Sequence, residues 1–399
     1  MSNEKLAKSV NEYFTTGRDN SLFKNLTDFY ELVQPFDKHE TQLIALTSIL
    51  PLINNANGTS SNLLITGTTG IGKDKLVNDT LLPFPNKHIL EFEHVTKKTL
   101  TGLKIDFTNK ILHLNDVTPS LFNEESYLSL TTRNKGETKH TVDYIEKQGH
   151  TLREVGGKPV IISTTNRLYE VKPDHYRRHT NLILKDSEER KSKRINLLVD
   201  RAENPNKYLP TKTLQEQIKN LYEFEYDVKI PYATELAKEF MTQNNLPTNF
   251  TSQLGKILDY IRAYTVILNY DKPIDVTNNI KTLEATKEIY NDYVRPLITR
   301  VFGNDIQGYV GNTKLVYQLL LLSTNPAKKA GFTISELSTE FEERYGYNLK
   351  YETIVRQLRN LQDDNRVKLD YTRTHPTNFR LLLTAKLIDN EIKFPILKW

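Results

Sequence analysis

The chain has 399 residues with 16 Gly, 16 Pro and no cysteine, a length that predicts two or three domains at roughly 100 to 200 residues each. The lack of cysteine excludes disulfide frameworks, Cys-ligated metal sites and thiol catalysis, and a mean hydropathy of −0.54 without any long apolar run argues against a helical membrane span. Lys and Arg (54) barely outnumber Asp and Glu (49), so nucleic-acid binding must be argued from the position of the charges and not from the net charge of +5.

The N-terminal part of the chain predicts helices. Its first ten residues are polar and of mixed charge, unlike a secretory signal, so we expect a cytoplasmic protein. Apolar residues recur at helical spacing over residues 28–53, with a break at Pro35. A turn-rich stretch, residues 54–62, ends this pattern. We assign residues 1–56 to an N-terminal helical segment.

Short apolar strands alternate with turns and helices up to about residue 200. Such alternation predicts an α/β domain of three layers, with a sheet between two layers of helices, and we assign it to residues 57–204. A mixed-charge run at residues 187–194 is typical of the solvated face of a helix. The four clearest strands are residues 63–65, 88–90, 111–114 and 159–162.

The strongest local signal is LLITGTTGIGKDK at residues 63–75, in which an apolar strand runs into a glycine-rich turn and a Lys. Backbone N–H groups of such a turn wrap a phosphate at the N-terminus of the next helix, and Lys73 supplies charge for the outer phosphates. Asp74 stands where Ser or Thr usually offers a hydroxyl to Mg²⁺. The expected ATP contacts are Gly67, Thr68, Thr69, Gly70, Ile71, Gly72, Lys73, Asp74 and Lys75.

Two later strands end in polar residues. The strand at residues 110–114 leads to Asn115 and Asp116, the position of a Walker B pair, whose first acid stands behind a water of the metal and whose second polarises the attacking water. Residues 158–165 lead to Asn166, whose amide is expected at the γ-phosphate or the lytic water. The expected Mg²⁺ site comprises Asp74, Asn115 and Asp116, and the expected catalytic residues include Lys73, Asp116 and Asn166.

A β-hairpin is predicted between these two strands. Apolar residues flank the turn at Gln148 and Gly149, and the tip carries Lys147 and His150, with Arg153 following. On a hairpin without a partner these would be ordinary surface charges.

Beyond Pro205 the pattern becomes helical, and residues 205–308 are assigned to a helical lid domain. The expected helices cover residues 213–222, 232–244, 251–268 and 275–302, separated by Pro or Asn breaks.

Residues 309–399 show the order helix, helix, helix and paired strands that is typical of a winged helix. The helix at residues 351–361 has an apolar stripe, which leaves its polar residues, Gln357 included, for an exposed or half-exposed face. The preceding helix carries acidic residues, so binding of another protein is an alternative to contact with DNA. The expected DNA contacts are Lys350, Arg356, Arg359 and, in the wing, Arg373.

Three features together resemble the superfamily 3 viral helicases and related MCM-like AAA+ helicases of plasmids, phages and mobile elements. They are the P-loop, the distance of some forty residues from it to Asn115 and Asp116, and the strand ending in Asn166. The resemblance covers about residues 40–300. It implies an AAA+ core with a helical lid, Mg²⁺ and ATP as cofactors, and a homo-oligomeric ring, a hexamer, around single-stranded or forked DNA. A sensor-2 arginine, expected near Ser252, is missing.

The resemblance also implies roles for basic residues. The hairpin before the third strand projects into the channel in these helicases, which implies that Lys147, His150 and Arg153 grip DNA. Arg177 or Arg178 would reach the nucleotide of a neighbouring subunit.

The sequence is therefore interpreted as an ATP-driven, ring-forming DNA helicase or translocase that replicates a mobile element, plasmid or virus. Two alternatives stay open. One is an origin-recognition-type initiator or loader, which combines an AAA+ module with a C-terminal winged helix. The other is a DNA-binding NTP switch with weak hydrolysis, which Asp74 and Asn115 would explain.

Overall fold

The computed structural model describes residues 21–56, 62–67, 69–93, 95, 106–118, 121, 127, 130–131, 139–146, 149–157, 159–166, 178–184, 188–242, 250–272, 276–302, 311–322, 332–345, 348–363, 368–370, 380–382 and 394–397.

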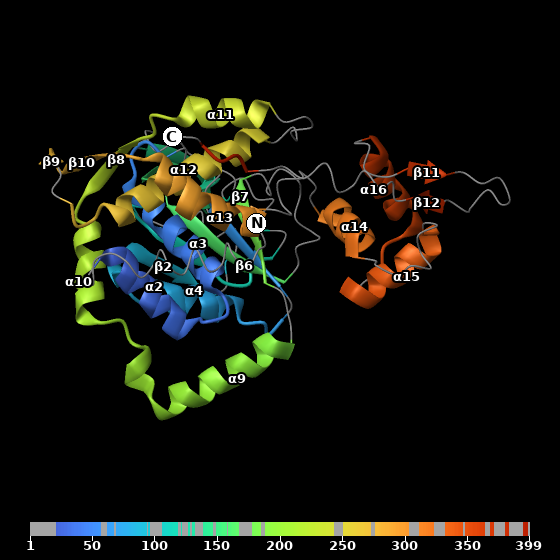
Figure 1. Ribbon diagram of the computed structural model, residues 1–399, viewed down its shortest axis with the longest axis horizontal. Coiled ribbons are helices and arrows are strands. Elements are labelled where there is room, and N and C mark those ends of the chain that lie inside the picture. Colours follow the sequence, from blue (N-terminus) through green and yellow to red (C-terminus); the bar gives the residue numbers. More distant parts are fainter. Residues whose placement is uncertain are drawn as a thin grey trace.

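The larger unit contains a parallel sheet of five strands (Figure 1). Its strands lie in the order β2-β3-β6-β1-β7, and every neighbouring pair is parallel. This confirms the predicted α/β class and its four strands, and it is consistent with an AAA+ fold. The strands are β1 (Asn62–Thr66), β2 (Ile89–Phe92), β3 (Ile111–Leu114), β6 (Val160–Thr165) and β7 (His179–Ile183).

Both faces of the sheet are covered, because its strands are apolar on both sides. β1, β3 and β6 are buried along their whole length, as parallel strands under helices must be. Successive residues of β1 enter different cores: Leu63 and Ile65 pack with the helices of one face, and Leu64 packs with Leu112 and Ile161 on the other.

The N-terminal helices belong to the first of these cores. α2 (Leu22–Val33) and α3 (Lys38–Ile49) pack against α4 (Lys73–Leu81) and α12 (Phe250–Leu268), and the chain breaks between α2 and α3, as predicted at Pro35. The expected helical segment is thus packed into the same hydrophobic core as β1 and α4.

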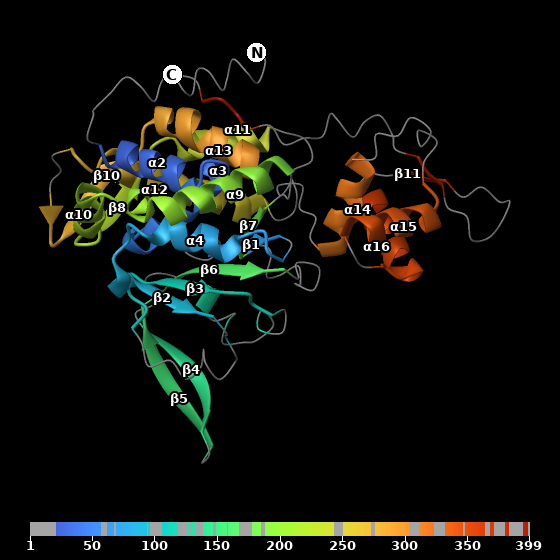
Figure 2. The same ribbon diagram turned by 90° about the horizontal axis from the view of Figure 1, so that it is seen from below.

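The predicted hairpin is present. β4 (Lys139–Glu146) pairs with β5 (Gly149–Gly156) in antiparallel register, with Glu146 opposite Gly149. In Figure 2 this hairpin extends away from the five-stranded sheet as a separate arm.

The stretch after residue 205 differs from the helical prediction. Three expected helices are confirmed as α10 (Lys212–Leu221), α11 (Ala233–Met241) and α12, but the fourth is wrong in its first half. There, β9 (Val276–Thr277) turns through Asn278 and Asn279, both with positive φ, into β10 (Ile280–Glu284). β10 pairs in parallel with β8 (Glu225–Lys229), and only then do η5 (Ile289–Val294) and α13 (Arg295–Phe302) follow. A turn with left-handed residues reverses the chain, which a helix cannot do.

A second hydrophobic core holds the C-terminal helices α14 (Gly311–Leu322), α15 (Ile334–Tyr345) and α16 (Tyr351–Asp363). β11 (Lys368–Asp370) and β12 (Arg380–Leu382) then pair antiparallel, so the element order is the predicted one, and its assignment as a winged helix stays a prediction. Gln357 corrects one detail: it is buried and hydrogen-bonds with Thr313.

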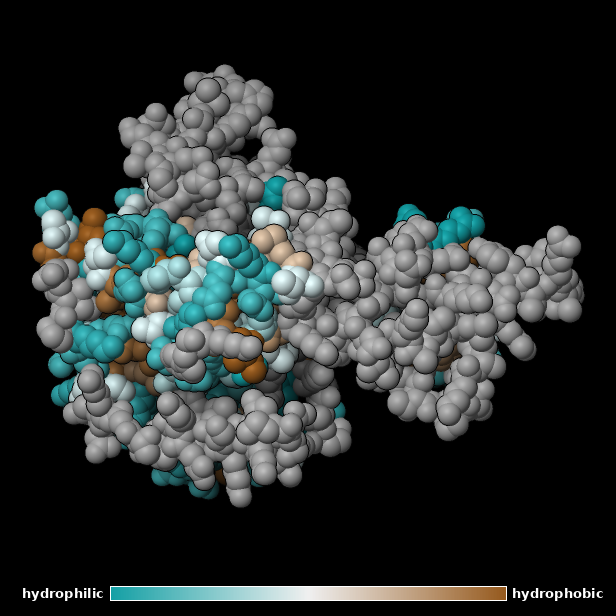
Figure 3. Space-filling view, turned by 45° about the horizontal axis from the view of Figure 1, so that its top comes forward, coloured by the Kyte–Doolittle hydropathy of each residue, from teal (hydrophilic) through white to brown (hydrophobic). Residues whose placement is uncertain are grey.

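Among the described helices, none is long and apolar enough to cross a membrane. The coloured residues of the larger unit in Figure 3 are mostly hydrophilic, with smaller hydrophobic patches between them.

Candidate nucleotide site

The loop between β1 and α4 has the backbone form that phosphate binding requires. Gly70 and Gly72 adopt φ values of 81° and 83°, which L side chains rarely adopt, and Gly72 caps α4 from the left-handed region. The first N–H groups of α4 therefore follow a turn that only glycine tolerates, a usual place for an anion.

Lys73 opens α4 and is almost buried. Its Nζ donates to the carbonyl of Gly67 at 3.1 Å. Burial lowers the pKa of Lys73, and the nearby carboxylates of Asp74 and Asp116 oppose that shift. The charge of this ammonium is therefore costly to bury without anionic neighbours, and phosphate oxygens would supply more of them.

The carboxyl ends of β3 and β6 meet the start of α4. The hydroxyl of Thr164, on β6, donates to Oδ1 of Asp74 at 2.5 Å and accepts from the backbone N–H of Asp116 at 2.9 Å. Asp116 is exposed and has a φ of 44°. Asn166, just beyond β6, donates through Nδ2 to the hydroxyl of Thr69 at 3.2 Å. Lys73, Asp74, Asp116 and Asn166 thus meet around one loop.

A metal ion here would have to rely on ligands beyond the protein. Among the described residues, no group of three His, Cys, Asp or Glu side chains is arranged to hold one. Mg²⁺ commonly takes one or two carboxylates and completes its shell with water and substrate phosphates, so Asp74 and Asp116 fit such an ion.

Asn115, the third expected metal residue, is directed to β2. Its Nδ2 donates to Oε1 of Glu91 at 2.8 Å, while its Oδ1 is buried and has no hydrogen-bond partner. Oε1 of Glu91 also accepts from Nδ2 of Asn78, on α4, at 3.3 Å. His113 is buried beside this group, and burial lowers its pKa against the opposing effects of Glu91 and Asp74.

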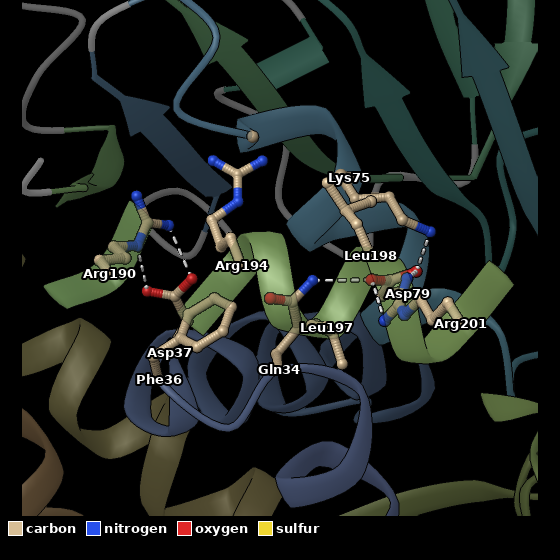
Figure 4. A pocket seen from close by; sticks show the side chains of 11 residues that line it. Gln34, Phe36, Asp37, Lys75, Asp79, Arg190, Arg194, Leu197, Leu198 and Arg201 are labelled. Atoms are coloured by element: carbon tan, nitrogen blue, oxygen red, sulfur yellow. Dashed lines mark hydrogen bonds and ion pairs between the residues drawn. The ribbon is translucent and has the colours of Figure 1, made fainter. Parts of the chain in front are cut away.

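Helix α9 (Glu188–Glu203) lies against the P-loop, as Figure 4 shows. Arg190 donates through Nε and Nη2 to both oxygens of Asp37, at 3.1 and 2.7 Å, and through Nη1 to the carbonyl of Ile71 at 3.2 Å. Arg194 donates to the carbonyls of Gly70 and Ile71. Residues 191–193 are exposed, as a solvated helix face predicts, but Arg190 departs from this prediction because it is buried in an ion pair.

A shallow, open hollow that encloses only about 20 Å³ lies between α9, α4 and the break before α3 (Figure 4). Phe36, Asp37, Gly72 and Arg194 are among its lining residues. A Cβ on Gly72 would lie 2.2 Å from a guanidinium nitrogen of Arg194, so this glycine also makes room for α9.

The remaining expected residues are dispersed. Arg178 is half-buried directly before β7, and its carbonyl accepts from Nδ2 of Asn62 at 3.3 Å. His150 and Arg153 stand on β5, at the tip and further along the arm. Lys350, Arg356 and Arg359 are exposed at α16. Thr68, Lys147, Arg177 and Arg373, and the side chains of His150 and Arg153, lie outside the described residues.

Sequence reasoning missed two groups of residues at the site. Arg190, Arg194 and Arg201 recur at helical spacing, so their common face on α9 could have been noticed, although not its partner Asp37. Glu91 follows apolar residues in a short strand, and nothing local marks it as a neighbour of Asn115.

No family model matches the sequence, and no curated protein matches it either. Among solved structures, the chain is similar to a full-length MCM homolog from Methanopyrus kandleri, with 11% sequence identity and a TM-score of 0.42. The match covers 78% of this chain and 63% of that chain, so this chain spans less than two thirds of that protein. The α/β fold is assigned from the parallel sheet and not from this distant likeness.

Proposed function

We propose that this protein binds ATP with Mg²⁺ at the loop between β1 and α4 and hydrolyses it to move along DNA as a ring-forming helicase or translocase. The observation that carries the nucleotide site is the convergence of Lys73, Asp74, Asp116 and Asn166 around a loop with two left-handed glycines. Two strand ends and one helix start supply these groups, which is what transfer of a phosphoryl group to water requires.

Each residue has a role in this proposal. The N-terminus of α4 and Lys73 bind and orient the phosphates. Asp116 accepts a hydrogen bond from the attacking water and polarises it, and Asn166 orients that water or the γ-phosphate. Mg²⁺, when bound, would neutralise charge that develops on the phosphate oxygens. Asp74 would hold the ion or one of its waters.

The nucleoside is proposed to lie on the open surface over the shallow hollow beside α9, not enclosed within it. The hollow opens next to Gly72 and Lys75, and Phe36 offers an aromatic face at its wall (Figure 4). An aromatic ring and a polar rim suit a base and a ribose.

Lys73→Ala tests the enzyme proposal. We expect this variant to lose ATP-dependent separation of forked DNA, since it removes the ammonium that contacts the carbonyl of Gly67 in the loop. Lys219→Ala, an exposed residue of α10, is the matched control and should unwind like the wild type. Unimpaired unwinding by Lys73→Ala would refute the proposal.

DNA binding and ring assembly are proposed from the resemblance and from the hairpin arm. Electron microscopy of the protein with an ATP analogue and forked DNA should show a closed ring with DNA in its pore. A single copy clamped on duplex DNA would instead support the origin-recognition-type initiator or loader. Replication of a mobile element, plasmid or virus is the role that the resemblance suggests.

A second candidate, a DNA-binding switch with weak hydrolysis, is favoured by the hydrogen bonds of Asp74 and Asn115. Asp74, which replaces the usual hydroxyl, accepts a hydrogen bond from Thr164, and Asn115 is paired with Glu91. Nucleotide binding without measurable ATPase in the presence of DNA would favour the switch over the helicase.

A further inference from the structure

At the nucleotide site, a neutral amide stands at the end of β3 and a carboxylate stands on the neighbouring strand β2. At the end of β3, where a carboxylate is expected, Asn115 presents a neutral amide. On β2, Glu91 accepts from that amide at 2.8 Å. Adjacent strands lie about 4.8 Å apart, so the carboxylate on β2 is in contact with the end of β3.

Besides Asn115, two other residues lie at the carboxylate of Glu91. Nδ2 of Asn78, one turn along α4 from Asp74, donates to the same oxygen, and Nδ1 of His113 lies 3.7 Å from it. The side chain of Glu91 is 42% exposed, so water reaches part of its carboxylate.

Two polar groups beside Glu91 have unused hydrogen-bonding capacity. Oδ1 of Asn115 is buried without a hydrogen-bond partner, and so are both ring nitrogens of His113, which is fully buried. Asp74, at the start of α4, and Glu91, on β2, both act electrostatically on His113. Buried polar atoms in proteins are rarely left unpaired, and a water of a hydrated cation would satisfy them.

We propose that Glu91 and Asn115 act together as the strand-end acid of the ATPase: Asn115 accepts a hydrogen bond from a water of the nucleotide-bound Mg²⁺, and Glu91 supplies the negative charge. Glu91 is thus a positioning residue, acting through Asn115. This inference rests on the proposed ATPase function. It explains why a neutral residue at the end of β3 does not leave the metal site short of charge.

The Mg²⁺ dependence of the site tests this inference. Glu91→Gln keeps the shape and an acceptor oxygen but removes the charge. Mutation of a residue that hydrogen-bonds a ligand of a metal ion typically lowers metal affinity or activity by 10- to 100-fold. We therefore expect the Mg²⁺ concentration for half-maximal ATPase, and for half-maximal binding of a fluorescent ATP analogue, to rise by about tenfold or more. Binding of the analogue in EDTA should stay within about twofold of the wild type.

A charge exchange provides the decisive comparison. Asn115→Asp alone places two carboxylates in contact and should also weaken the Mg²⁺ response. The double variant Glu91→Gln with Asn115→Asp returns one carboxylate and one amide to the pair, and it should recover most of the wild-type Mg²⁺ dependence. Glu216→Gln, an exposed residue of α10, is the control that should change nothing.

The outcomes separate this inference from the proposed function. A Mg²⁺-dependent wild type with an unchanged Glu91→Gln variant, or additive losses in the double variant, would overturn the inference alone. A wild-type protein that neither binds nor hydrolyses ATP would overturn both.

Discussion

At the scale of single residues, the ion pair between Asp37 and Arg190 connects three parts of the chain. Both side chains are more than nine-tenths buried, and the guanidinium uses its third nitrogen on the carbonyl of Ile71 in the P-loop. The break before α3, the P-loop and α9 are therefore held by one arginine. Planar, bidentate donors of this kind suit a buried carboxylate better than a lysine does.

Removing the carboxylate should be costly. Asp37→Ala leaves a buried guanidinium without its partner, a change that typically costs about 3 to 5 kcal/mol. We expect a lower free energy of unfolding in urea and weaker binding of a fluorescent ATP analogue. Lys38→Ala, which removes a more exposed ion pair with Glu31, should cost about 1 kcal/mol or less. Equal losses in the two variants would contradict a special role for the buried pair.

Lys256 is a buried residue with a pH-dependent effect. Its Nζ donates to the carbonyl of His179 at 2.6 Å, and burial lowers its pKa to about 7, from 10.5. The native state therefore loses this proton at lower pH than the unfolded chain does. The cost of burying the charge is complete below about pH 7, shrinks as the pH rises, and is absent above 10.5.

Lys256→Met should therefore stabilise the protein at neutral and lower pH. The gain in free energy of unfolding is expected to be roughly 2 to 4 kcal/mol below pH 7 and to fall towards zero as the pH approaches the unfolded value. Thermal unfolding of both proteins at a series of pH values from 6 to about 10 measures the difference. A constant difference across this range would show that the ammonium is not buried at a cost.

At the scale of elements, the sequence predicts those features whose signal is local. β1, the glycine turn and Lys73 are adjacent in the chain, and the four apolar strands were identifiable because a parallel sheet buries both of its faces. The same holds for the hairpin, whose strands flank their own turn.

The features that sequence reasoning missed depend on partners far away in the chain. Arg190 meets Asp37 across 153 residues, and β10 is a strand because β8, some fifty residues earlier, offers it a parallel partner. The mixed-charge run at residues 187–194 and the residues of β10 are assigned correctly only when these distant partners are known. Tertiary pairing overrides local preference in both cases.

The hairpin arm carries a prediction about DNA. Lys147→Ala or His150→Ala should reduce the stimulation of ATPase by single-stranded DNA and leave nucleotide binding intact. A lysine on the phosphate backbone releases about one counterion, so Lys147→Ala should also flatten the salt dependence of DNA binding by a slope of roughly 0.7. Lys139→Ala, at the opposite end of β4, serves as control. Unchanged stimulation and slope would exclude the hairpin from the DNA path.

At the scale of the whole molecule, residues 394–397 pack against the larger unit. After the C-terminal helices with their separate core, Leu397 is buried in the first core and Phe394 packs edge-on against Phe240, with ring centroids 6.0 Å apart. Asn291 exchanges two hydrogen bonds with the backbone of Leu397, at 2.9 and 3.1 Å. In the sequence, α14, α15 and α16 therefore stand between two segments that belong to the first core, α13 and residues 394–397.

A segment attached at both ends explores fewer arrangements than one attached at a single end, so loss of the C-terminal attachment should free the second unit. Asn291→Ala removes both hydrogen bonds to Leu397 and is expected to release residues 394–397 without unfolding either core. Because the chain has no cysteine, Leu209→Cys and Tyr351→Cys, at two exposed positions, allow a donor and an acceptor dye to be attached. The distribution of distances between the dyes should broaden in the Asn291→Ala background and stay narrow with Glu284→Ala, an exposed residue of β10. Identical distributions in both backgrounds would show that the tail does not restrain the second unit.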